Sequence, residues 1–76
     1  MEAFRVLAHW DQEAQVWWAE STDIKGLVAE SETLEGLLDE LRGVVPDLLQ
    51  LNHHLAAQSV EIHLMADRIE GVRIPA

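Results

Sequence analysis

The chain has 76 residues and no cysteine, and its 14 acidic against 5 basic residues give a formal net charge of −9. A chain of this size builds barely one core, so we expect a single domain over residues 1–76 and a homodimer. The lack of cysteine excludes disulfides, thiolate metal sites and thiol nucleophiles. The negative charge disfavours direct binding of nucleic acid and favours a basic protein partner, although acidity also serves solubility alone.

The sequence shows neither the pattern of a transmembrane helix nor that of an N-terminal signal peptide. No run approaches the roughly 18 apolar residues of a transmembrane helix. The N-terminal stretch Met1–Arg5 lacks a basic region followed by an apolar core and a cleavage site. We therefore expect a cytoplasmic protein that does not contact a membrane.

The first third of the chain has the pattern of strands. Apolar residues recur at every second position from Phe4 to Trp10, which predicts a strand with one buried face. A polar turn follows, and the β-rich run 14–21 completes an antiparallel hairpin. Gly26 ends a second turn, where it is free to adopt a positive φ, and residues 27–30 are predicted to form a short third strand.

A helix is predicted to begin after Thr33, whose hydroxyl can cap the first turn, with Glu35 at the positive end of the dipole. Its buried stripe has helical spacing and consists of Leu34, Leu37, Leu38, Leu41 and Val45. Gly43 is expected to end this helix, and Pro46 to begin a second short helix over residues 46–51.

Residues 60–66 alternate again, which predicts a fourth strand, and residues 68–76 are expected to form an extended tail able to add an edge pairing in a dimer. The predicted order is β-β-β-α-β. This is an α+β fold of two layers, with an antiparallel sheet and one main helix on one face.

Three tryptophans are candidates for an interface. Trp17 and Trp18 are adjacent, so in a strand one ring enters the core and the other stands on the open face. An exposed tryptophan is typical of an interface, and we assign Trp10, Trp17 and Trp18 to the core and to a dimer or partner surface. A base-stacking platform would need more basic residues than Arg5 and Lys25.

Part of the sequence resembles a known bacterial family. The segments are Trp10-Asp11-x-Glu13-Ala14-x-Val16-Trp17, then Asp23-Ile24-Lys25-Gly26-Leu27, then Glu30-x-x-Thr33-Leu34-x-x-Leu37, and later Pro46-Asp47-Leu48-Leu49. Together they resemble the short HicB-like domains, and among these most closely a small subgroup of unknown function. Lys25 stands where the family turn often has proline. The similarity extends from Phe4 to Asn52.

This resemblance implies a partial ribonuclease-H-like fold, a dimer and binding of a small basic RNA-cleaving toxin of the HicA type. HicB antitoxins also carry a DNA-binding segment, for which the residues up to Ala76 leave no room, so operator binding is not among the properties that we carry over from the resemblance. A docking surface for the toxin would consist of acidic residues on the helix and its approach, namely Glu30, Glu32, Glu35, Asp39 and Glu40. The same residues also suit the wet face of an amphipathic helix.

Metal binding and catalysis have little support in the sequence. His53 and His54 are adjacent and would point apart, while His9 and His63 could be cross-strand neighbours but make only two ligands. The carboxylates are scattered over turns and a helix surface, and no nucleophile–base pair or phosphate loop is visible. We expect no metal, no cofactor and no catalytic residue.

Three functions follow, in order of preference. The first is an antitoxin-like module that neutralises a basic toxin by binding it. The second is a stand-alone structural or regulatory homodimer with another partner. The third is a degenerate nuclease with residual metal-dependent activity, which would depend on carboxylates such as Asp11 and Asp39.

Overall fold

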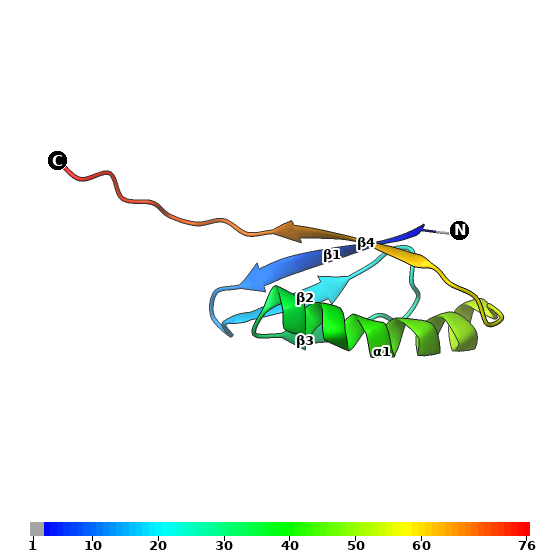
Figure 1. Cartoon of the computed structure of the whole chain (residues 1–76). Helices are drawn as coiled ribbons and strands as arrows, with labels where there is room; N and C mark the ends of the chain where they lie inside the picture. The colour runs from blue at the N-terminus through cyan, green and yellow to red at the C-terminus, as the bar shows by residue number, and fades with distance from the viewer. Residues whose placement is uncertain (1–2) are drawn as a thin grey trace.

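The structure, a computed structural model, describes residues 3–76 and contains one sheet and one helix (Figure 1). Its elements are β1 (Ala3–Asp11), β2 (Val16–Glu20), β3 (Ala29–Ser31), α1 (Leu34–His53) and β4 (Glu61–Asp67). The strands lie in the order β3-β2-β1-β4. The predicted β-β-β-α-β order and the two-layer α+β fold are confirmed.

The sheet is mixed, which corrects the expected antiparallel sheet. β2 pairs antiparallel with β1 and with β3, whereas β4 pairs parallel with β1. The reason lies in the connection: α1 carries the chain back along the sheet, so β4 enters beside β1 in the same direction. Local alternation in residues 60–66 contains no information on this direction.

α1 is one helix of 20 residues and does not end at Gly43 or restart at Pro46. Thr33 caps its first turn as expected, because its hydroxyl accepts a hydrogen bond from the Gly36 N–H at 2.9 Å. Val45 and Leu49 are both buried on either side of Pro46, which is itself exposed. Packing of the continuous apolar stripe therefore outweighs the local cost of proline and glycine.

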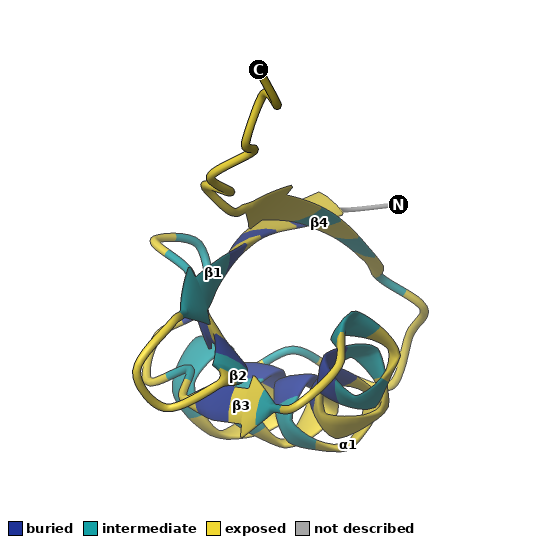
Figure 2. Ribbon diagram, turned by 90° about the vertical axis from the view of Figure 1, so that its left-hand side faces the viewer, coloured by how far each residue is buried: buried dark blue, intermediate teal, exposed yellow. Residues whose placement is uncertain are grey.

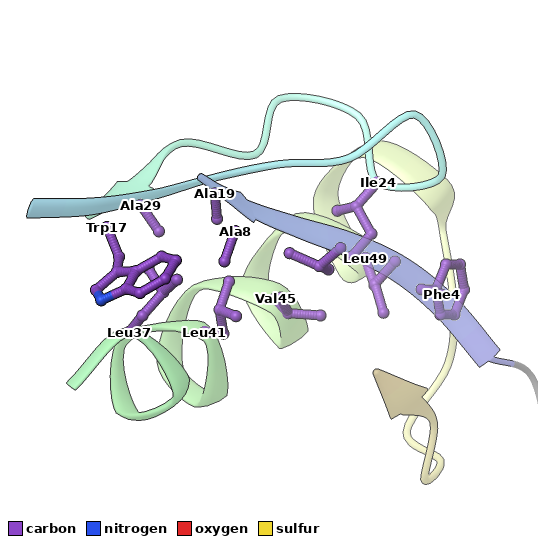
Figure 3. Close-up of a cluster of buried hydrophobic side chains, with 11 residues drawn as sticks. Phe4, Ala8, Trp17, Ala19, Ile24, Ala29, Leu37, Leu41, Val45 and Leu49 are labelled. Carbon is purple, nitrogen blue, oxygen red and sulfur yellow. The ribbon is translucent and has the colours of Figure 1, made fainter. Parts of the chain in front are cut away.

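The core lies between α1 and the helix side of the sheet (Figure 3). Phe4, Val6 and Ala8 of β1 face it, as their alternation predicts. Trp17 lies at one end and Phe4 at the other, with the helix residues Leu37 to Leu49 along its length. Because α1 packs mainly on β2 and β3, β4 lies on the far side of the sheet from it, and its residues Ile62 and Leu64 are only partly buried against the core (Figure 2).

Side-chain hydrogen bonds fix the loop between β2 and β3. The Ser21 hydroxyl donates to the Arg5 carbonyl at 2.6 Å and accepts from the backbone N–H of Asp23 and Ile24. This places Ile24 in the core with no exposed surface. Gly26 then turns the chain at a φ of 85°, which confirms the expected positive φ.

Candidate protein interface on the open sheet face

The sheet face turned away from α1 has no covering layer among the described residues. In-register pairing sets its side chains in rows, because partners across neighbouring strands point to the same face. One row crosses all four strands and consists of Glu30, Trp18, His9 and Asp67. The next row consists of Glu20, Leu7 and Met65.

Trp18, Leu7 and Met65 form an apolar diagonal across β2, β1 and β4, which we call the open-face patch. The exposed fractions of these residues are 39%, 37% and 37%. Large apolar side chains that stay accessible side by side are typical of interaction sites. Carboxylates border the patch: Glu30 on β3, Glu20 on β2 and Asp67 on β4.

His9 holds the tryptophan at the edge of the patch. Its ring lies 4.6 Å from the Trp18 ring, centroid to centroid, at an interplanar angle of 34°. Its Nε2 lies 3.2 Å from Glu20 Oε2, outside good hydrogen-bond geometry, and that nitrogen is shielded from solvent. The Trp18 ring is therefore supported on one side and open to solvent on the other, as an anchor for a partner needs to be.

The structure separates the three tryptophans of the predicted interface. Trp17 is a core residue with 8% exposure, and its ring lies 5.4 Å from that of Trp10. Trp10 is half-buried, with the Arg68 guanidinium 4.1 Å above its ring. Only Trp18 stands on the open face, so the expectation that Trp17 and Trp18 take opposite faces is confirmed.

The five predicted acidic docking residues are all exposed but do not share one surface. Glu30 points to the open face beside Trp18, whereas Glu35 and Asp39 lie one turn apart on α1. Asp39 is paired with Arg42, which offsets its charge. Glu32 precedes the helix, and Glu40 lies one position after Asp39 on another side of it. Glu30 is therefore the member of this set that borders the open-face patch.

The four histidines lie at separate places in the fold. The Nε2 atom of His53 accepts a hydrogen bond from the Lys25 N–H at 3.0 Å, and His54 ends α1 in the left-handed conformation at a φ of 57°. His9 lies opposite Asp67 and His63 opposite Arg5, so these two imidazoles are not cross-strand neighbours. No group of three or more His, Asp or Glu side chains in residues 3–76 could hold a metal ion.

The carboxylates considered for a nuclease site lie apart as well. The Asp11 side chain accepts hydrogen bonds from the N–H groups of Glu13 and Ala14 in the first turn. Asp39 lies on the surface of α1. Asp23 accepts the Arg5 N–H at 2.8 Å, and this bond lowers the pKa of its carboxyl below the ordinary value.

Leu7 and Met65 were missed as interface residues by reading the sequence. The signal was present: both are large apolar residues at positions where the alternation of their strand predicts the solvent-facing side. Among residues 3–76, no helix has the length and apolar character needed to cross a membrane.

Comparison with known proteins places the chain in a family. A crystal structure of the hypothetical protein TTHA1013 from the extremely thermophilic bacterium Thermus thermophilus is similar to it, with 44% sequence identity and a TM-score of 0.80. The alignment covers 93% of this chain and 100% of that one. A comparison with curated proteins found no match. The pattern of the domain of unknown function DUF1902 matches residues 3–76, and the chain belongs to that family.

Proposed function

We propose that this chain is a protein-binding module that takes up a small basic protein on the open face of its sheet. The observation that carries the proposal is the open-face patch, in which Trp18 stands between Leu7 and the acidic residue Glu30 without a covering layer. Tryptophan is enriched among the residues that dominate binding energy at protein interfaces.

Charge supports a basic partner over a neutral or acidic one. The net charge of −9 gives the whole molecule a field that attracts positively charged proteins and speeds their encounter. Glu20, Glu30 and Asp67 border the patch and would pair with lysine or arginine around an apolar centre. A nucleic-acid ligand fits poorly, because its phosphates would meet this same rim.

The resemblance to HicB-like domains suggests which basic protein this is. A HicA-type toxin is small, basic and cleaves RNA, and a chain that covers its cationic surface would block access of RNA. In this reading the module has no catalytic chemistry of its own and acts by occupation. The resemblance and the open-face patch are the two supports for this toxin-binding role.

The experiment is affinity capture from the lysate of the source cells, with the tagged wild type and two variants as bait. Trp18→Glu introduces a charge into the open-face patch, and Val28→Glu introduces one at an 82% exposed valine on the loop before β3. We expect the wild type and Val28→Glu to capture a small basic protein, and we expect high salt to weaken this capture. Trp18→Glu should not capture the protein. Equal capture by all three baits would contradict the proposed surface.

A further inference from the structure

The free edge of the sheet and the C-terminal tail point to a second copy of this chain as a partner. This inference concerns surfaces other than the open-face patch and does not depend on the proposed function. Within residues 3–76, β4 has a neighbouring strand only on its β1 side. Its seven residues present unpaired backbone N–H and C=O groups along the other side, and a long open edge of this kind is a template for pairing.

The tail after β4 is extended and runs away from the body of the molecule (Figure 1). It carries three large aliphatic residues that are almost fully exposed, Ile69 at 91%, Val72 at 85% and Ile74 at 88%. Ordering these residues costs conformational entropy, and no apolar surface is buried in return while they stay in water. They are therefore suited to contact a surface of another molecule.

The direction of the tail side chains follows from its first residues. Arg68 stacks on Trp10, which faces the helix side of the sheet, and Arg68 also pairs with Glu70 at 2.6 Å. If the tail pairs as a strand, alternation of its side chains would set Val72 and Ile74 on the same side as Arg68. A paired tail would thus present Val72 and Ile74 on the helix side of the sheet.

A matching apolar groove lies at the other end of β4. It has a volume of about 90 Å³ and is lined by three residues of α1 and five of the following loop, namely Pro46, Leu49, Gln50, Leu55, Ala56, Ala57, Gln58 and Val60. At ~30 Å³ for a water molecule, this is space for about three waters, or for one branched aliphatic side chain. The groove thus suits a valine or isoleucine side chain.

Val72 cannot fill the groove of its own chain. The groove adjoins the start of β4, whereas the tail leaves from its end, and seven strand residues separate the two by about 23 Å. Five residues, from Asp67 to Val72, span at most ~18 Å. Val72 therefore reaches a groove of this kind only on another copy.

We propose that two copies pair antiparallel along β4 and that the tail of each fills the groove of the other. Antiparallel pairing sets the residues after one β4 beside the residues before the other. In a register centred on Leu64, Ile62 lies opposite Ala66 of the second copy, and the tail continues past the start of the second β4 toward the groove that Ala56 lines there. Both sides of this arrangement are the same, so the dimer closes with two-fold symmetry.

Two further features favour a second copy. Ile62 and Leu64 are only half-buried and Ala66 is exposed on the helix side of β4, and pairing with a second β4 would continue this apolar surface across the edge. The tail also contains Arg68 and Arg73, two of the five basic residues, and would lay them against an acidic body.

Sedimentation velocity of the full chain tests the proposal, with Val72→Asp compared with Val28→Asp. These two valines are exposed to 85% and 82%, so neither change should unfold the monomer, which far-UV circular dichroism checks. We expect wild type and Val28→Asp to be dimers at micromolar concentration, and the dimer dissociation constant of Val72→Asp to rise at least about tenfold. A monomeric wild type, or equal behaviour of the two variants, overturns the proposal.

A disulfide test checks the arrangement independently, because the chain has no cysteine of its own. The double variant Ala56→Cys/Val72→Cys should form a cross-linked dimer on mild oxidation, while Ala56→Cys/Val28→Cys should not. Failure of the first pair to cross-link, together with dimers of wild type, would show that the copies meet elsewhere.

Discussion

Replacing Trp17 by alanine removes the largest side chain of the core, whereas the same change at its neighbour Trp18 removes a partly solvated ring. Trp17 has 8% exposure and packs against Trp10, so its loss leaves a cavity and should cost ~3–5 kcal/mol of unfolding free energy. Trp18 stands on the open face with 39% exposure, and its loss should cost only ~1–2 kcal/mol, because water fills the space.

These costs are large for so small a protein. At ~0.05–0.15 kcal/mol per residue, the unfolding free energy of 76 residues is about 4–11 kcal/mol. Trp17→Ala should therefore be partly or wholly unfolded at 37 °C, while Trp18→Ala stays folded. Urea titration followed by far-UV circular dichroism measures both at equal protein concentration, which keeps any dimer contribution the same. Equal losses, or a larger loss for Trp18→Ala, would refute the assignment of the two faces.

Two further predictions concern turns and charge. Gly26→Ala should lower the unfolding free energy by ~1–2 kcal/mol, because φ is 85° and the new Cβ would lie 3.2 Å from the Asn52 side chain. Gly43→Ala, in open space on α1, should raise the unfolding free energy by ~0.5–1 kcal/mol. Thermal unfolding distinguishes the two signs. Asp23→Asn should destabilise the protein at neutral pH, since the Arg5 N–H lowers the pKa of the folded carboxyl. The ionised Asp23 carboxyl therefore stabilises the fold above its ordinary pKa of 3.8, and this stabilisation is lost as the pH falls through the lowered pKa. The melting temperatures of wild type and Asp23→Asn should converge in acid, and a difference that stays constant with pH would contradict this cause.

Much of the fold could be read from the sequence because it depends on local pattern. The alternation from Phe4 to Trp10 specifies which side of β1 is buried, and the stripe from Leu37 to Val45 specifies the buried side of α1. The Thr33 cap and the turn at Gly26 depend on only a few neighbouring residues, and both were predicted.

The features that were not predicted depend on distant contacts. Pro46 stays inside α1 because Val45 and Leu49 are packed by strands far away in the sequence. Which tryptophan is buried depends on the hairpin register, in which Trp10 lies opposite Trp17. That register results from a loop in which Gln15 has a φ of 58°. A glutamine in the sequence does not predict a positive φ, because non-glycine residues rarely adopt one.

The candidate site was half predictable for the same reason. An exposed tryptophan followed from two adjacent tryptophans in a strand, but its neighbours did not. Leu7 and Met65 meet only because β4 pairs with β1 in parallel, a pairing created by the crossover through α1. The acidic set is divided between sheet face and helix because Glu30 precedes the helix by a turn.

The measurement that tests the central claim most directly is RNA cleavage by the small basic protein recovered with this chain, with and without equimolar chain added. We predict that wild type and Val28→Glu stop RNA cleavage, and that Trp18→Glu, folded to the same extent, does not reduce it. Cleavage unaffected by the wild type, or stopped equally by Trp18→Glu, would contradict the claim that the open-face patch neutralises a basic partner.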